Sequence, residues 1–295
     1  MARLDKTTGE ERVLGILVLL IESEASSKGI FSVEIMDPGR ALTPSAPLTG
    51  HDHARLARTK MLRRAVQEKN TEIDKDEAKQ IGPYELEKKI GEGGIGEVYL
   101  ARHALLRRPA AIKLLKKRSI NPETLDRFER EVRQTSRLTH PNTVEIYDYG
   151  HTPTGTFYYA MEYLPGLTMA QLIQEEGAIV PRRVVHLLDQ VCASLSEAHA
   201  KGLIHRDIKP QNIMLCERGG IYDTVKVLDF GLVKDVSDPE NIQHTAPDQL
   251  GGTPMYIAPE RIRDPSRNDA RTDLYAVGTV AYNLLTGSNP LRRRQ

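Results

Sequence analysis

One short segment, residues 203–212, constrains this chain more than any other: Leu-Ile-His-Arg-Asp-Ile-Lys-Pro-Gln-Asn. It places a carboxylate at Asp207, an ammonium at Lys209 and an amide at Asn212 in one loop. A carboxylate can orient a hydroxyl and accept its proton, an ammonium can neutralise phosphate charge, and an amide oxygen is a ligand that Mg²⁺ accepts. Such a loop needs two further parts: a segment that holds phosphates and a second oxygen ligand for the metal ion.

Both parts occur in the chain. Asp229 lies in the sequence Val-Leu-Asp-Phe-Gly at 227–231 and offers a second carboxylate. A glycine-rich segment lies upstream and consists of Gly91, Glu92, Gly93, Gly94, Ile95 and Gly96. The pattern G-x-G-x-x-G alone also fits a dinucleotide-binding turn, but in that turn a helix follows directly. Residues 98–101 predict a strand instead, so the glycines join two strands of a hairpin.

A lysine interrupts the apolar strand predicted at 109–115. Lys113 is costly to bury without a partner of opposite charge, and the alternative is a strand residue that points to the surface. The next helix is predicted to begin with Asn121 as its N-cap and to end at 140–142. Its inward stripe consists of Leu125, Phe128, Val132 and Leu138. Glu131 borders that stripe, whereas Glu129 lies well off the buried face. The segment 127–132 resembles the regulatory helix of protein kinases, which implies that Glu131 is the partner of the lysine and leaves Glu129 as the rival candidate.

The remainder of the chain predicts mainly helices. We expect a hairpin at 144–161, a short helix at 167–173 and a long helix at 181–201. A strand at 213–215 is expected to lead into a long turn at 216–224. A final apolar helix is expected to run from Asp273 to Thr286, where Gly287 stops it.

Together these motifs resemble the protein kinases. H-R-D-x-x-x-x-N at 205–212, D-F-G at 229–231 and A-P-E at 258–260 follow the glycine-rich segment and the lysine strand in the kinase order. The residues of the glycine-rich segment and of 103–113 are similar to bacterial Hanks-type (eukaryotic-like) serine/threonine kinases. The resemblance implies an α+β, two-lobed protein-kinase-like fold, with a small antiparallel β lobe that carries one regulatory helix and a mainly helical large lobe.

The resemblance also implies ATP and Mg²⁺ as cofactors and a role for each candidate residue. Asp207 would orient the substrate hydroxyl beside Lys209, and Lys113 would hold phosphates while paired with Glu131. Asn212 and Asp229 would bind the metal ion. The glycine-rich segment, Gly91 to Gly96, would close over the phosphates, and the remaining nucleotide-binding residues would be Val98, Ala111, Met161, Glu162, Leu164 and Met214.

Residues 232–260 would form an activation segment. The resemblance implies that Thr253 contacts the catalytic Asp and Lys, which accompanies a preference for Ser/Thr substrates, and that Thr245 is the phosphorylated residue. Arg206 would lie near this segment, His205 would pack beneath the metal-binding loop, and Asp273 would brace the catalytic loop.

The sequence therefore predicts a protein serine/threonine kinase that transfers the γ-phosphate of ATP to Ser/Thr hydroxyls of proteins, under control of activation-segment phosphorylation. The alternative is a nucleotide-binding but inactive kinase-like scaffold or fragment. A small-molecule phosphotransferase is disfavoured because the chain carries the docking segment at 251–260 and Lys209. Self-association and autophosphorylation in trans are both compatible with this prediction.

The predicted domains are an N-terminal extension at 1–80 and a kinase domain at 81–295, divided into a small lobe at 81–161, a hinge at 162–165 and a large lobe at 166–295. The extension holds an apolar run at 13–21 that is too short for a membrane span, a linker and a charged helix. Membrane association is therefore an alternative that no full-length transmembrane span supports.

Net charge and cysteine content complete the prediction. A net charge of +1 argues against nucleic-acid partners, and two isolated cysteines favour a cytoplasmic protein. The last helices of a kinase large lobe are not recognisable, so we expect an incomplete lobe: a fragment, a truncated product or a chain that a partner completes.

Overall fold

A computed structural model describes residues 80–93, 96–115, 122–230, 254–264 and 269–288. The predictions for the N-terminal extension lie outside these residues. So do those for four candidate site residues: Gly94, Ile95, Thr245 and Thr253.

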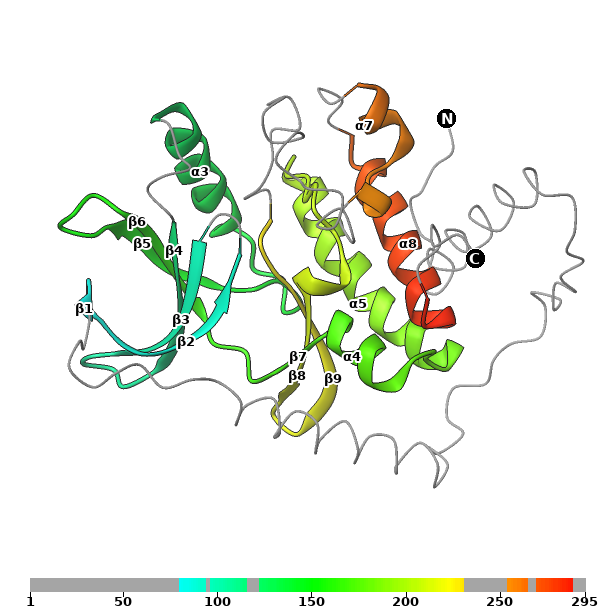
Figure 1. The fold of residues 1–295 in the computed structure, drawn as a ribbon, viewed down its shortest axis with the longest axis horizontal. Helices are drawn as coiled ribbons and strands as arrows, with labels where there is room; N and C mark the ends of the chain where they lie inside the picture. The colour runs from blue at the N-terminus through cyan, green and yellow to red at the C-terminus, as the bar shows by residue number, and fades with distance from the viewer. Residues whose placement is uncertain (1–79, 94–95, 116–121, 231–253, 265–268, 289–295) are drawn as a thin grey trace, which may run out of the picture.

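The small lobe is a six-stranded antiparallel sheet with the strand order β1-β2-β3-β4-β6-β5 (Figure 1). Its strands are β1 (Gln80–Ile81), β2 (Tyr84–Glu92), β3 (Gly96–His103), β4 (Pro109–Leu115), β5 (Ile146–His151) and β6 (Phe157–Glu162). Strand residues alternate between two apolar clusters, as the two-residue period of a strand requires. Ala111 and Tyr159 pack on one face, and Ile112 and Tyr158 pack on the other.

Helix α3 (Pro122–Thr135) covers the face of the sheet that carries Ala111 and Tyr159. Phe128 and Val132 are buried there, as the predicted stripe requires. The predicted end of the helix was wrong, because α3 stops at Thr135, whose hydroxyl bonds the Glu131 carbonyl oxygen. Leu138 lies beyond the helix and packs into the core of the large lobe.

The large lobe is built on helices α4 (Met169–Glu176), α5 (Pro181–Ala200) and α8 (Arg271–Thr286) (Figure 1). Their apolar faces form one core. The long helix is close to its predicted bounds, and α8 ends at Gly287, whose φ of 65° suits glycine. The short helix begins later than predicted, because residues 166–168 form strand β7 and Thr168 caps α4 with a reciprocal Gln171 hydrogen bond.

A small sheet with the order β7-β8-β9 lies between the two main parts (Figure 1). It comprises β7 (Gly166–Thr168), β8 (Ile213–Arg218) and β9 (Ile221–Val227). The predicted long turn at 216–224 was wrong, because both strands extend into it and only Gly219 and Gly220 remain between them. Short helices η2 (Pro210–Asn212), η3 (Pro254–Tyr256) and α7 (Pro259–Arg263) complete the lobe.

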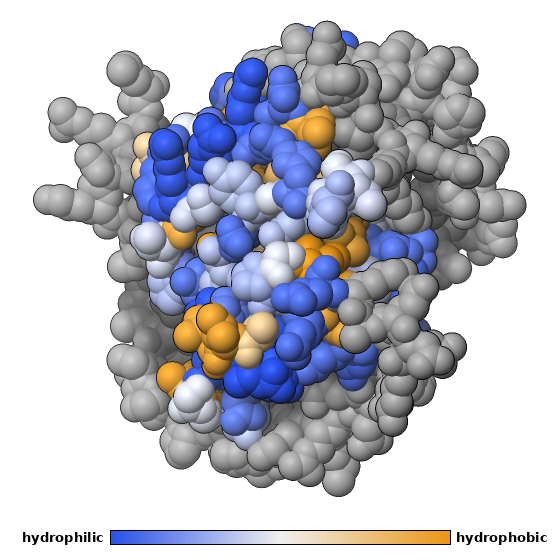
Figure 2. All heavy atoms as spheres, turned by 90° about the vertical axis from the view of Figure 1, so that its left-hand side faces the viewer, coloured by the Kyte–Doolittle hydropathy of each residue, from blue (hydrophilic) through white to orange (hydrophobic). Residues whose placement is uncertain are grey.

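The end of the small lobe presents a mostly hydrophilic surface with separate hydrophobic patches (Figure 2). Two large apolar side chains in the turn between β3 and β4 are exposed: Leu105 at 88% and Leu106 at 68%. In the part of the chain that the structure describes, no helix has the length and apolar character needed to cross a bilayer.

Candidate active site

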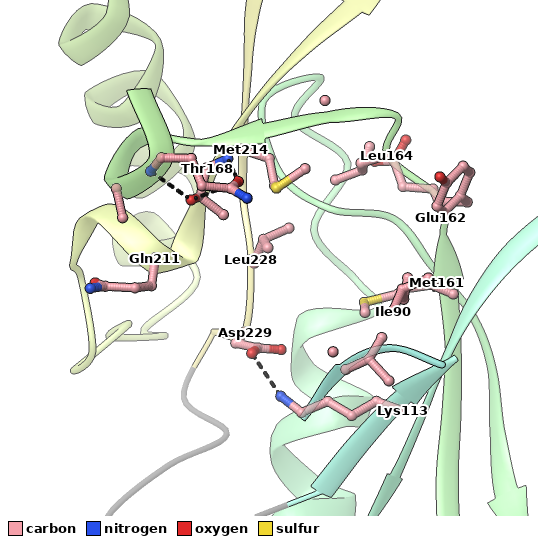
Figure 3. Close-up of a pocket in the computed structure, with 17 residues that line it drawn as sticks. Ile90, Lys113, Met161, Glu162, Leu164, Thr168, Gln211, Met214, Leu228 and Asp229 are labelled. Atoms are coloured by element: carbon pink, nitrogen blue, oxygen red, sulfur yellow. Dashed lines mark hydrogen bonds and ion pairs between the residues drawn. The ribbon is translucent and has the colours of Figure 1, made fainter. Parts of the chain in front are cut away.

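A cavity of about 530 Å³ lies between the small-lobe sheet and the β7-β8-β9 sheet (Figure 3). Its volume falls in the range typical of small-molecule sites. Residues from both lobes line it, including six of the predicted nucleotide-binding side chains: Val98, Ala111, Met161, Glu162, Leu164 and Met214. Lys113 and Asp229 lie at one end of it (Figure 3).

The glycine-rich segment joins β2 to β3, as predicted, and Gly91 lines the cavity. Gly91 pairs with Val98, and Glu92 pairs with Glu97 across the hairpin. The amide of Gly93 donates to the Gly96 carbonyl at 2.8 Å. Gly96 lies so close to β4 that an added Cβ would overlap the Leu114 carbonyl oxygen, so the third glycine is required by the sheet itself.

Lys113 is buried, at 9% exposure, and its Nζ lies 2.7 Å from Oδ2 of Asp229. The hydroxyl of Tyr159 donates to the other oxygen, Oδ1, at 2.8 Å. Burial raises the pKa of Asp229, but the Lys113 ammonium and both hydrogen bonds outweigh it and hold that pKa below its usual value. Asp229 is therefore a carboxylate, and its φ of 53° turns it out of the regular strand conformation.

The predicted ion pair between Lys113 and Glu131 was wrong for this structure. Among the described residues, Lys113 pairs with Asp229, and Glu131 accepts from Nη1 of Arg206 at 3.3 Å. Helix α3 presents Glu131 at the border of its buried face, as expected, but its carboxylate meets the catalytic loop rather than the strand lysine. The rival candidate, Glu129, pairs with His151.

The catalytic-loop residues do converge as predicted. Lys209 Nζ lies 2.6 Å from Oδ2 of Asp207. The short helix η2 brings Asn212 back to Asp207, where Nδ2 of Asn212 donates to the backbone oxygen at 2.8 Å and to Oδ2 at 3.0 Å. Because the amide nitrogen is used in this way, the amide oxygen of Asn212 points away from Asp207. The Leu228 amide donates to the backbone carbonyl oxygen of Asn212 at 2.9 Å, so Asn212, just before β8, and Asp229, just after β9, lie beside each other.

Asp273 on α8 holds the backbone of this loop by hydrogen bonds, which confirms the predicted role of Asp273. Its carboxylate accepts from the amides of His205 and Arg206, each at 2.8 Å, and from Nε2 of His199 at 2.8 Å. Burial raises the pKa of Asp273, but these hydrogen bonds lower it below its usual value. The ring of His205 is fully buried and contacts the Leu228 carbonyl at 2.7 Å. It lies tilted by 50° against the Phe230 ring, with 4.6 Å between ring centres.

Glu162 ends β6, and its side chain is buried on the large-lobe side. It pairs with Lys226 on β9 at 2.5 Å and with Arg218 on β8. It also accepts from the amide of Glu145 at 3.0 Å. These contacts fix the connection between the lobes, so the backbone at 162–164 lines the cavity in a defined position.

The donor set fits a magnesium ion that is bound together with phosphates. Asp229 offers a carboxylate and Asn212 an amide oxygen, and Mg²⁺ prefers oxygen ligands and keeps waters or phosphates in its remaining positions. The apolar cavity beside them, lined by Val98, Ala111 and Met161, fits a flat aromatic base.

Several side chains at the site were not predicted. Thr168, Gln171 and Gln211 line the cavity, and Tyr159 contacts Asp229. Arg261 on α7 is also new, with Nη1 3.1 Å from the Arg206 carbonyl oxygen. Sequence patterns give little signal for these residues, because each acts through a tertiary contact; only the Thr168–Gln171 capping box has the spacing of a known motif.

Comparisons with known proteins identify the same features. The protein kinase domain family matches residues 84–295. The chain is 42% identical over 209 residues to the serine/threonine-protein kinase pkn3 of Myxococcus xanthus, covering 70% of this chain and 38% of that protein. It is 39% identical over 212 residues to PknB of Mycolicibacterium smegmatis, covering 70% of this chain and 33% of PknB.

Among solved structures, the PknI kinase domain of Mycobacterium tuberculosis is similar, with a TM-score of 0.58 and 26% identity over 73% of this chain and 79% of that chain. The described fold is thus that of a two-lobed kinase. The chain belongs to the protein kinase family and is related to the bacterial Hanks-type serine/threonine kinases. It spans 33% to 38% of the length of these two curated relatives.

Proposed function

We propose that this chain is the catalytic part of an ATP- and Mg²⁺-dependent protein serine/threonine kinase. The observation that carries the proposal is the convergence of Lys113 and Asp229 at one end of a nucleotide-sized cavity. The Asp207–Lys209–Asn212 cluster adjoins it through the pairing of Asn212 with Leu228. The family and its curated serine/threonine kinase relatives support the substrate class.

Each residue has a proposed task in phosphoryl transfer. Asp207 orients the substrate hydroxyl and accepts its proton, and Lys209 offsets negative charge beside it. Asp229 and Asn212 would hold the metal ion, which would supply positive charge to offset that of the phosphates. Lys113 holds phosphates from the sheet side. Most of the rate enhancement in this chemistry comes from such positioning and charge stabilisation.

Two substitutions test the proposal: Lys113→Met and Asp229→Asn. We expect each to reduce phosphate transfer to a generic basic protein by about 100-fold or more, because each removes a charge that stabilises the transferred phosphoryl group. Circular dichroism and thermal unfolding report whether the fold is kept. Full activity in either folded variant would contradict the assignment of the site.

An inactive nucleotide-binding scaffold is the second candidate, and one observation favours it: Glu131 is paired with Arg206 rather than with Lys113. In kinases the pair between the strand lysine and the helix glutamate has to be in place for transfer. Binding of ATP by the native protein without any transfer of radiolabel would support the scaffold.

We also propose that the protein acts on protein substrates in the cytoplasm, modifies itself, and is controlled through Thr245 in its activation segment, with Thr253 contacting the catalytic residues. Cys192 and Cys216 are both buried and are not joined in a disulfide, which supports a reducing compartment. Intact-mass spectrometry after incubation with Mg²⁺ and ATP tests self-modification. Its dependence on protein concentration separates transfer in trans, with transient self-association, from transfer in cis.

A further inference from the structure

A buried phenol contacts the proposed metal-binding carboxylate. Tyr159 lies on β6 and is 1% exposed, and its hydroxyl donates to Oδ1 of Asp229 at 2.8 Å. Asp229 Oδ2 is meanwhile paired with Lys113. Both oxygens of this carboxylate are thus held by donors from the small lobe, although Asp229 itself belongs to the large lobe.

The two donors come from directly opposed positions in the sheet. Lys113 on β4 and Tyr159 on β6 are register partners, so their side chains leave the same face side by side. The Lys113 ammonium lies 5.8 Å from the centre of the Tyr159 ring. The two side chains therefore reach the carboxylate together, one to each oxygen, and they fix its plane as well as its position.

The phenol is held rigidly. Its ring packs between sheet and helix, with Phe128 of α3 at 6.4 Å between ring centres, in the same cluster as Phe157 and Val132. Burial, together with the nearby Asp229 charge, raises the pKa of Tyr159 well above its usual value. The hydroxyl is therefore a neutral donor, and its oxygen cannot move away from Asp229 without disturbing the core.

Nucleotide binding should affect the contacts of the two donors with Asp229 differently. Lys113 faces the cavity and is the proposed phosphate ligand, so its ammonium is shared with the phosphates when nucleotide binds. The Tyr159 hydroxyl is not among the groups that line the cavity in the described part of the chain, so its bond to Asp229 persists. Hydrogen-bond partners of metal ligands orient the ligand, and their loss typically weakens metal binding about 10- to 100-fold.

We propose that Tyr159 is a positioning residue for the metal ion: its hydroxyl holds the Asp229 carboxylate so that the free lone pairs face the nucleotide cavity. This inference rests on the proposed function of the site. A purely structural tyrosine would also bury its ring and find an acceptor. The two interpretations differ in one measurable property, the strength with which Mg²⁺ enhances nucleotide binding.

The test compares the native protein with Tyr159→Phe, which removes the hydroxyl and keeps the ring. The matched control is Tyr158→Phe, the neighbouring tyrosine on the opposite face of β6, 5% exposed and packed in the other cluster. Binding of the non-hydrolysable nucleotide AMP-PNP is measured by calorimetry with Mg²⁺ and with EDTA. Mn²⁺ affinity of each nucleotide complex is measured separately by electron paramagnetic resonance at low temperature, where a less stable variant stays folded.

We expect Tyr159→Phe to bind AMP-PNP in EDTA with the same affinity as the native protein. The factor by which Mg²⁺ raises that affinity should be about tenfold smaller than in the native protein, and the Mn²⁺ affinity should fall by a matching factor. Tyr158→Phe should keep the native gain. An unchanged gain in folded Tyr159→Phe would overturn the inference, and a tighter metal affinity would overturn it as well by showing that the hydroxyl competes with the ion. If the native protein shows no metal-dependent gain, the proposed function fails together with the inference.

Discussion

The Glu131 carboxylate on α3 accepts a hydrogen bond from the Arg206 guanidinium in the catalytic loop, at 3.3 Å. This contact joins the regulatory helix to the large lobe and gives Glu131 a partner other than Lys113. A group with two alternative partners can report the state of a site, because each partner stabilises a different position of the helix that carries it.

Glu131→Gln distinguishes a pair with Arg206 from a pair with Lys113, because the two pairs should affect stability and phosphate transfer differently. Removing the charge costs about 0 to 1 kcal/mol of stability, since the Arg206 side chain is 30% exposed in this pair and solvent screens the charges. If Glu131 moves to Lys113 during turnover, phosphate transfer should fall about tenfold or more. Radiolabel transfer and thermal unfolding measure the two effects.

The control for this substitution is Glu129→Gln on the same helix, which removes the charge that pairs with His151. It should leave phosphate transfer at the native level. Native activity in Glu131→Gln would show that turnover does not depend on a pair between Glu131 and Lys113.

Lys226→Met should destabilise the protein strongly. It removes the 2.5 Å partner of Glu162, a carboxylate that is 4% exposed at the end of β6. Breaking a buried ion pair from one side typically costs about 3 to 5 kcal/mol. Arg218 still pairs with Glu162 in this variant, so we expect a loss at the lower end of that range. Urea unfolding at neutral pH measures the loss.

The double variant Glu162→Gln/Lys226→Met tests the cause. Gln keeps an acceptor for the Glu145 amide but carries no charge. The double variant should be more stable than Lys226→Met alone. Equal or lower stability would mean that lost packing of the Lys226 side chain, rather than the uncompensated charge, explains the effect.

Glu197 on α5 predicts a pH dependence of stability. Burial raises the pKa of Glu197, but hydrogen bonds from Lys201, from the Thr139 amide and hydroxyl and from the His140 amide outweigh it and lower the pKa to about 2. A carboxyl whose folded pKa is depressed stabilises the fold above its unfolded pKa of about 4.3 and loses that contribution as pH falls.

We therefore expect Glu197→Gln to be about 1 to 2 kcal/mol less stable than the native protein at pH 7, a value reduced from the full shift because solvent screens a partly exposed group. This difference in the free energy of unfolding should narrow as pH falls below about 5 and disappear near the pKa of Glu197 in the folded protein. Urea unfolding across this range measures it. Glu175→Gln on α4, whose side chain is exposed, should show no such gap; a gap independent of pH at Glu197 would contradict the assignment.

Gly96→Ala should lower stability by about 1 to 3 kcal/mol, because its Cβ would overlap the backbone of β4 at Leu114 and force the strands apart. Gly93→Ala is the matched change: within the described residues, an added Cβ there meets no atom within 4 Å. Thermal unfolding of both variants checks the difference. Equal losses would show that backbone freedom, not close approach, is what both positions require.

Much of the fold could be predicted because its signals are local. The alternation of β2, the apolar run of β4 and the stripe on α5 each reflect the period of a single element. Element ends were less predictable. Helix α3 stops before 140–142, and the amides of Arg137 and Leu138 donate to carbonyls only three residues back. Residues 216–224 look polar but extend a strand pair around two glycines.

The convergence of the candidate site residues with fixed spacing, such as Asp207, Lys209 and Asn212, could be predicted because one loop holds all three. The ion-pair partner of Glu131 could not be predicted in this way. Whether Glu131 meets Lys113 or Arg206 depends on where a helix lies against two lobes, and sequence spacing carries no information on that position. The Tyr159 contact was missed for a similar reason, since a tyrosine in a buried strand normally indicates core packing.

The register of β4 against β6 has a consequence for which mutations this protein tolerates. Lys113 and Tyr159 face each other in a ladder of two-residue period, so deleting one residue from either strand would turn one of the two side chains to the opposite face. Insertions in the β5–β6 connection at 152–156 leave that ladder intact and should be accepted far more readily. In this lineage, length variation should therefore accumulate at the hairpin tip and be absent from the two strands beside the carboxylate.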